Sequence, residues 1–230
     1  MKSSLKNMVI ALFVITAVSA LLVALVNDVT KGAIELSQQQ TKDAAKYKVL
    51  GVTSDEALVL SDTTRLIGDF EITVSTVASK ADNSVLGYAV EAPSITKSGY
   101  ADRITLMVGF VEEGDGCVVN GVEVLSQKET PGLGANMTKE GNSLERSIVG
   151  KSAKDVKFGV TKEGGSFDAL TGSTISSRAY ANAIETAYAG YLWATGRLNT
   201  SAEAVEAAPS GASMTYDNSE PEAQKGESNE

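Results

Sequence analysis

A run of 19 residues without a charged side chain, Met8–Val26, constrains this chain more than any other feature. Its length matches the hydrocarbon core of a bilayer, which a helix of about 20 apolar residues can cross. Lys2 and Lys6 precede the run, and Asp28 follows it. The positive-inside rule therefore predicts that residues 1–7 are cytoplasmic and that the bulk of the chain lies on the outer side of the membrane.

A cleaved signal peptide is the alternative, because Val18-Ser19-Ala20 resembles a small-residue cleavage site. However, the apolar run continues to Val26, whereas the apolar region of a signal peptide usually stops earlier. We therefore expect a membrane anchor. A single span with no ionisable group inside it cannot conduct ions by itself, so any ion transport would belong to other proteins.

Composition narrows the chemistry. The chain has no histidine, which excludes His-ligated zinc or haem and any nucleophile activated by histidine. The single cysteine, Cys117, excludes an intrachain disulfide and an all-cysteine iron–sulfur site, and its strand-like surroundings predict a buried, inert thiol. A net charge of −9 argues against nucleic acid as a partner. Redox chemistry would need an organic cofactor.

Alternation of apolar and polar residues predicts several strands. The expected strands are 70–74, 85–92, 103–111, 118–125 and 154–160. Short turns between them indicate an antiparallel meander, and Asn120-Gly121 indicates a bulge. The apolar stripe of a helix over Ser176–Ala194 would pack on this sheet. The expected fold class is therefore α+β: an antiparallel sheet packed with helices, preceded by a single N-terminal transmembrane helix.

These segments divide the chain into five expected parts. They are a cytoplasmic N-terminus (1–7), a transmembrane helix (8–26), a connecting helix (27–50), a folded domain (51–200) and an acidic tail (201–230). The tail holds seven acidic residues against one lysine, with few large apolar residues. It cannot bury enough surface to offset its ordering entropy, so we expect it to be disordered.

A group of hydroxyl side chains lies where a glycine-rich loop enters the last helix, in Asp168-Ala169-Leu170-Thr171-Gly172-Ser173-Thr174. A helix start favours anions, because its first N–H groups are unpaired and its dipole is positive there. Thr174 offers a hydroxyl for a phosphoester, and Gly172 lets a phosphate approach the backbone. Thr171 and Ser173 can donate hydrogen bonds to phosphate oxygens. The alternative is that these hydroxyls merely cap the helix.

Two further features of this motif stay open. The Asp168 carboxylate would repel a phosphate, so either it caps the loop or a modifying enzyme recognises it together with a metal ion. Should Thr174 not be the acceptor, the fallback hydroxyls are those of Ser173, Ser176 and Ser177.

A second motif, Glu129-Thr130-Pro131-Gly132-Leu133-Gly134, predicts a turn. Pro131 fixes φ, while Gly132 and Gly134 permit positive φ. Such a loop could pack flat against an aromatic ring and offer N–H groups to its polar edge, although an ordinary surface loop is the alternative. Three aromatic residues of the last helix are also candidates for ring contacts, with core packing as the alternative: Tyr188, Tyr191 and Trp193.

The two motifs, in this order and about 40 residues apart, resemble the FMN-binding domain family. They are similar to the signatures of two paralogous electron-transport proteins: the G subunit of the Rnf complex and the C subunit of the sodium-translocating NADH:quinone reductase. The resemblance spans roughly residues 5–195 and therefore identifies 51–200 as an FMN-binding domain. The length and the compact middle of the chain are closer to the Rnf protein.

In that family a dedicated flavin transferase joins the FMN phosphate to the last threonine of the motif. The resemblance therefore implies covalent FMN, as a phosphoester, on Thr174. It implies a surrounding site formed by the other motif residues: Asp168, Thr171, Gly172, Ser173, Glu129, Thr130, Gly132, Leu133 and Gly134.

The resemblance also implies a place in the cell. The chain would be a single-pass protein of the bacterial inner membrane, with its domain on the periplasmic side. It would carry electrons, without acid or base catalysis, in a complex that links ferredoxin and NAD to transport of Na⁺ or H⁺. Its partners would be the membrane lipid and the other subunits, including a second covalent flavoprotein. The C subunit of the quinone reductase, a non-redox sensor or binding module, and an unmodified structural protein are the alternatives.

Overall fold

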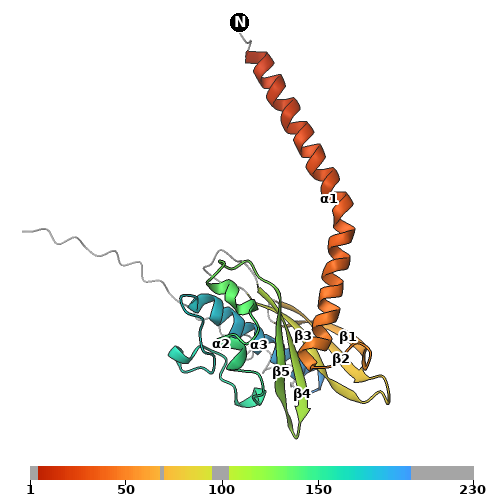
Figure 1. Cartoon of the computed structure of the whole chain (residues 1–230), viewed down its shortest axis with the longest axis vertical. Helices are drawn as coiled ribbons and strands as arrows, with labels where there is room; N and C mark the ends of the chain where they lie inside the picture. Colours follow the sequence, from red (N-terminus) through yellow and green to blue (C-terminus); the bar gives the residue numbers. More distant parts are fainter. Residues whose placement is uncertain (1–4, 68–69, 95–103, 198–230) are drawn as a thin grey trace, which may run out of the picture.

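The computed structural model describes residues 5–67, 70–94 and 104–197, and its longest element is the helix α1, Leu5–Leu50. The expected transmembrane and connecting segments form one continuous helix (Figure 1). No proline interrupts this stretch, so no hydrogen bond of the helix is lost to one. Its most apolar window of 18 residues is entirely exposed, and its length and composition suit a membrane span. The predicted acidic tail lies outside the described residues.

The sheet has five antiparallel strands in the order β1-β2-β3-β4-β5, which confirms the meander. The strands are β1 Ala57–Ile67, β2 Phe70–Ser79, β3 Val85–Ser94, β4 Ile104–Glu113 and β5 Gly116–Ser126. The predicted bulge is also present, because Gly109 faces Gly121 while Phe110 faces Val119, which leaves Asn120 unpaired in the register.

One predicted strand is wrong. Residues 154–160 form the end of the short helix η2, Ala153–Asp155, followed by a loop with an isolated bridge at Val160. Their alternation arises because Val156 and Val160 point into the core from an irregular segment. The strand that the prediction missed is β1, an edge strand whose middle is polar and exposed, so it lacks the apolar alternation of a half-buried strand.

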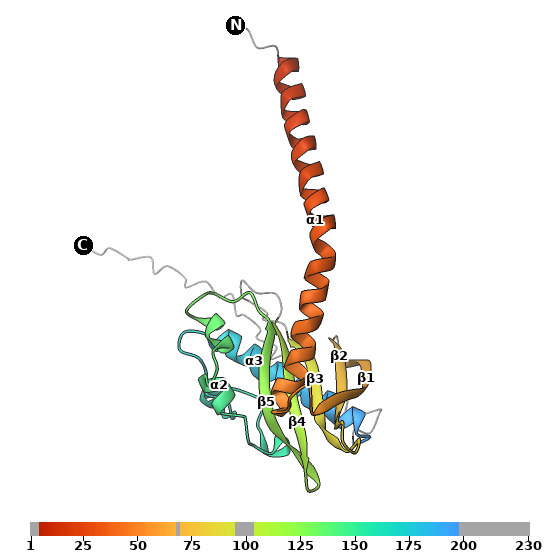
Figure 2. The same cartoon turned by 45° about the vertical axis from the view of Figure 1, so that its right-hand side comes forward.

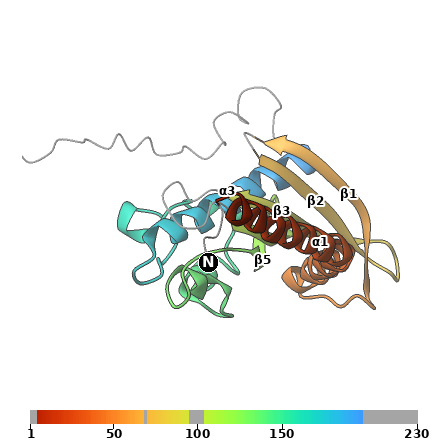
Figure 3. The ribbon, with the colours of Figure 1, turned by 90° about the horizontal axis from the view of Figure 1, so that it is seen from above.

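Two helices cover opposite faces of the sheet (Figure 3). Helix α3, Thr174–Ala194, confirms the predicted last helix and packs on one face, where it buries Ile184, Ala187 and Tyr191. Gly190 allows this approach, since a methyl group there would stand 3.0 Å from Ile72. The C-terminal end of α1 packs on the other face in a smaller apolar cluster. The result is the expected α+β architecture.

The end of α1 is held against the sheet by backbone contacts. A methyl group on Gly121 would stand 2.8 Å from the Val49 carbonyl oxygen, and the Asn120 side chain donates a hydrogen bond of 2.9 Å to that oxygen. Three lysines of α1 add ion pairs to the sheet: Lys42 with Glu91, Lys46 with Asp62 and Lys48 with Glu123. These contacts lie at the C-terminal end of one continuous helix. They therefore join α1 directly to the sheet.

Between β5 and α3 the chain is mostly irregular, with short helices at η1 Gly134–Thr138, α2 Ser143–Arg146, η2 and η3 Thr161–Glu163. Asn142 begins α2 by accepting hydrogen bonds from the N–H groups of Leu144 and Glu145. This region carries both sequence motifs and lies beside α3 (Figures 1 and 2).

Candidate functional site

The hydroxyl motif forms the start of α3. Ser173 is the N-cap residue and Thr174 is the first residue of the helix. The Ser173 side chain makes no capping hydrogen bond, so the first N–H groups of a 21-residue helix have no side-chain cap from it. Ser173 therefore does not act as a side-chain cap of α3. The N–H groups at the helix start remain available to bind an anion.

Exposure separates the candidate acceptors. Thr171 and Gly172 are exposed and Thr174 is half-buried, whereas all three fallback serines are buried, Ser177 completely. Ser177 also accepts a hydrogen bond from the Leu170 N–H and donates one to the Ser173 carbonyl oxygen. The Ser177 hydroxyl therefore holds the motif residues Leu170 and Ser173 in place, and a phosphate cannot reach it.

Asp168 is held through its backbone. Its N–H donates to the Ser147 hydroxyl, and its carbonyl oxygen accepts from the Ser143 hydroxyl. The residue is exposed, and its carboxylate makes no hydrogen bond or ion pair within the described ranges. The capping role that we considered for Asp168 is thus not seen there. Nothing in the sequence pointed to Ser143 and Ser147, because they lie more than 20 residues away.

The second motif forms the expected turn. The Thr130 carbonyl oxygen accepts from the N–H groups of Leu133 and Ala135. Gly132 has φ of +80°, a conformation that glycine adopts at little cost. The Asn136 side chain donates to the Gly132 carbonyl oxygen over 2.8 Å and fixes the far side of the turn.

The structure brings the two motifs together. The Ser176 hydroxyl, in the first turn of α3, donates a hydrogen bond of 2.8 Å to Oε2 of Glu129. Gly134 makes this contact possible, since a methyl group there would stand 2.5 Å from the Ser176 oxygen and 2.7 Å from Oε2 of Glu129. On the other side, a methyl group on Gly172 would stand 3.3 Å from the Leu133 side chain.

These features suit a flavin nucleotide. The exposed helix start suits its phosphate, and two apolar side chains beside it, Leu133 and Ile175, are 44% and 41% exposed. Such exposed apolar groups can cover one face of a flat ring. One oxygen of Glu129, Oε1, is buried and has no hydrogen-bond partner, which marks the junction of the motifs as a place where polar groups are incompletely satisfied.

The three candidate aromatic residues of α3 lie elsewhere. Tyr188, Tyr191 and Trp193 follow Thr174 by 14 to 19 residues, which corresponds to roughly 21–28 Å along a helix. Tyr188 and Tyr191 stack on each other with ring centres 6.2 Å apart, and both pack against Phe110. Trp193 is partly buried and packs against the same core. Core packing therefore accounts for the three residues. Cys117 lies in the same core, and burial raises the pKa of its thiol to about 11, which fits the inert thiol that we expected.

The site lies at one end of the sheet. Val49 of α1 contacts Gly121, whereas Lys48 pairs with Glu123, further along β5 toward Ser126. Helix α1 therefore leaves the sheet in the direction in which β5 runs. The Glu129–Gly134 motif follows β5 and so emerges at the end of the domain that faces the N-terminal part of α1 (Figure 2).

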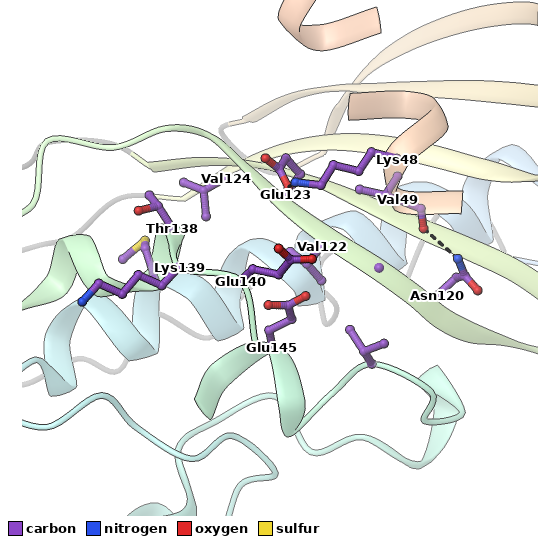
Figure 4. Close-up of a pocket in the computed structure, with 13 residues that line it drawn as sticks. Lys48, Val49, Asn120, Val122, Glu123, Val124, Thr138, Lys139, Glu140 and Glu145 are labelled. Carbon is purple, nitrogen blue, oxygen red and sulfur yellow. Dashed lines mark hydrogen bonds and ion pairs between the residues drawn. The ribbon is translucent and has the colours of Figure 1, made fainter. Parts of the chain in front are cut away.

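A separate pocket of about 230 Å³ lies between the end of α1, β5 and the η1–α2 segment. Its rim carries the ion pair of Lys48 and Glu123, 2.6 Å apart, whose side chains point toward each other in Figure 4. Their hydrogen bond raises the pKa of Lys48. None of the residues of the two motifs lines this pocket.

Comparison with known proteins agrees with the geometry. A family model described as an FMN-binding domain matches residues 99–189. The G subunit of the Na(+)-translocating ferredoxin:NAD(+) oxidoreductase complex of Acetobacterium woodii is 36% identical over 183 residues, which cover 75% of this chain and 84% of the relative. The G subunit of the ion-translocating oxidoreductase complex of Shewanella oneidensis is 31% identical over 192 residues, covering 80% and 87%.

A third relative, the G subunit of the ion-translocating oxidoreductase complex of Methanosarcina acetivorans, is 29% identical over 181 residues, covering 79% of this chain and 91% of the relative. Each alignment extends over most of this chain and most of the relative, so the similarity is not confined to the short motifs. The chain belongs to the family of G subunits of ion-translocating oxidoreductase (Rnf) complexes, with an FMN-binding domain.

Proposed function

We propose that this chain is the membrane-anchored electron-transfer subunit of an Rnf-type ferredoxin:NAD oxidoreductase complex, with FMN attached covalently to Thr174. The observation that carries the proposal is the meeting of the two motifs at the start of α3, through Ser176 and Glu129. The names of the relatives support the G subunit of an Rnf complex over the C subunit of the quinone reductase.

Attachment requires an acceptor hydroxyl that is not fully buried and a fixed phosphate site; Thr174 is half-buried, whereas the fallback serines are buried. The Thr174 oxygen would form the new P–O bond and its proton would pass to solvent, while the phosphoanhydride bond of a flavin dinucleotide breaks in the transferase and the other half of the donor leaves as a nucleoside monophosphate. The N–H groups at the start of α3 and the Thr171 hydroxyl would hold the phosphate. The exposed Asp168 carboxylate would be available to the transferase and its metal ion.

When bound, FMN supplies the electron-carrying chemistry. The residues of the chain would hold it: Leu133 and Ile175 would offer exposed apolar surface, and Thr130, Gly132 and Gly134 would shape the turn beside it. The apolar half of α1 would anchor the domain in the inner membrane, and Lys2 and Lys6 would keep the N-terminus cytoplasmic. The site would then face the outer membrane surface and the other subunits of the complex.

The test is the intact mass of the protein made together with a flavin transferase, followed by peptide mapping. We expect one added FMN on the peptide that contains Thr174. Thr174→Ala should remove the added mass and Thr174→Ser should retain it. Thr41→Ala, at an exposed position of α1 far from the motifs, should also retain it and is the matched control. An unmodified wild type, or flavin that persists on Thr174→Ala, would overturn the assignment.

A further inference from the structure

The Glu129 carboxylate is unusual among the acidic groups of the domain. Its Oε2 is bound by the Ser176 hydroxyl, whereas its Oε1 is buried without any partner. Glu129 also forms no ion pair with a lysine or arginine in the part of the chain that the structure describes. The residue as a whole is half-buried, but a carboxylate oxygen that is shielded from water and has no partner is costly, so its position calls for an explanation.

Two features make this position tolerable. The carboxylate lies at the first turn of α3, where the helix dipole favours a negative charge. The backbone around it is also fixed: the Glu129 N–H donates to the Gln127 side chain over 2.6 Å, and Gly134 leaves only enough room for the contact with Ser176. The carboxylate is thus held in place by these contacts, and one of its two oxygens is shielded from water.

We infer that Glu129 is a positioning residue of the flavin site that supplies a fixed negative charge and lowers the reduction potential of the bound FMN. The inference rests on the proposed attachment at Thr174, two residues before Ser176. Reduction adds negative charge to a flavin, and a nearby fixed carboxylate opposes this through space. Oε2 has the second role of holding the first turn of α3 in place.

The substitution that tests this is Glu129→Gln, which can keep the acceptor for Ser176 while it removes the charge. We expect the midpoint potential of the covalent flavin to rise. At a fixed potential, the ratio of reduced to oxidised flavin should increase on the order of tenfold, as for a unit charge about 10 Å away at an effective dielectric constant near 20. The matched control is Glu140→Gln, which removes an exposed carboxylate from the adjoining loop and should leave the potential unchanged.

Ser176→Ala separates the two roles of Glu129, because it removes the hydrogen bond but keeps the charge. Its flavin potential should stay at or below the wild-type value. The unloaded proteins give a second measurement that does not depend on flavin. Glu129→Gln should unfold at the wild-type temperature or above it, since it removes a charge that has one shielded, unpartnered oxygen. A large decrease would overturn the inference by showing that the carboxylate is needed for folding.

Intact mass, measured on the same samples, separates failure of this inference from failure of the proposed function. A wild type without added FMN would overturn both. Fully loaded wild type and Glu129→Gln with equal midpoint potentials would overturn the role of Glu129 alone. A higher potential in Glu129→Gln, with Glu140→Gln unchanged, is the result that we expect.

Discussion

The α-carbon of Gly109 lies so close to Val49 that a methyl group there would stand 2.2 Å from the Val49 carbonyl oxygen. This contact joins the central sheet to the last turn of the long N-terminal helix. Gly109→Ala should therefore push the helix end away and lower the free energy of unfolding by about 2–3 kcal/mol.

Chemical denaturation of the detergent-solubilised chain would measure this change. The control is Gly116→Ala, where the added methyl group would meet its nearest neighbour, Lys154, at an ordinary 3.8 Å. If Gly109→Ala proved as stable as the control, the close packing of α1 on β4 would be wrong.

The ion pair of Lys46 with Asp62 should make the stability of the fold depend on pH. Burial alone would raise the pKa of Asp62, but hydrogen bonds from Ser75 and Lys46 outweigh it and lower the pKa below 3.8. A carboxylate with a lowered pKa stabilises the fold above its ordinary pKa and loses that contribution as the pH falls through the lowered value. Since Asp62 is half exposed, the contribution is about 1 kcal/mol or less.

Asp62→Asn should therefore be less stable than wild type at neutral pH, and the two should converge as the pH falls below about 3.8. Urea unfolding across this range would show the convergence. Asp55→Asn, at an exposed turn position, should show no such trend. A difference that stayed constant at all pH values would contradict the assignment.

Arg65 lies over the ring of Trp193, with its guanidinium carbon 5.0 Å from the ring centre. The pair joins the edge strand β1 to the end of α3. Because Trp193 is the single tryptophan, its fluorescence reports on this contact directly. Arg65→Ala should shift the emission and cost about 0.5–1 kcal/mol. Arg146→Ala, at an exposed position of α2, should leave the spectrum as it is.

Removal of the Ser177 hydroxyl should destabilise the loop that carries the hydroxyl motif. Its replacement by alanine leaves the Leu170 N–H without its partner and frees the loop before Thr174. We expect a loss of about 1–3 kcal/mol and slower flavin attachment, measured by intact mass over time. Thr41→Ala removes a hydroxyl that bonds only within its own helix and serves as the control. Attachment at the wild-type rate in Ser177→Ala would contradict the structural role.

The elements that the sequence predicted well are those whose residues report their surroundings locally. The apolar content of β2 to β4 follows from burial under α3 on one face and under the end of α1 on the other, and the apolar stripe of α3 follows from its packing on the sheet. Strand β1 could not be recognised in this way, because its exposed middle is held by pairing with β2 and not by apolar burial. The strand predicted for residues 154–160 was wrong because buried side chains in a loop can also alternate with exposed ones.

The site shows the same division. The motifs predicted the turn at Glu129–Gly134 and the start of the last helix, because glycines such as Gly132 and Gly172 report local positive φ, whereas the role of Thr174 stays a prediction. The contact of Glu129 with Ser176, 47 residues apart, and the ties from Ser143 and Ser147 to Asp168 depend on how the irregular segment folds back. Short sequence patterns carry no information about such contacts.

Helix α1 runs without a break from its apolar half into the domain core. The number of residues in its connecting part therefore sets the height and the orientation of the flavin site. With the apolar half in the bilayer, as proposed, each residue inserted between Asp28 and Lys42 would move the domain by about 1.5 Å and turn it by about 100° about the helix axis. Insertions here therefore act as screw displacements. Seven added residues nearly restore the original orientation at a greater height, whereas two would turn the flavin site to the opposite side of the helix.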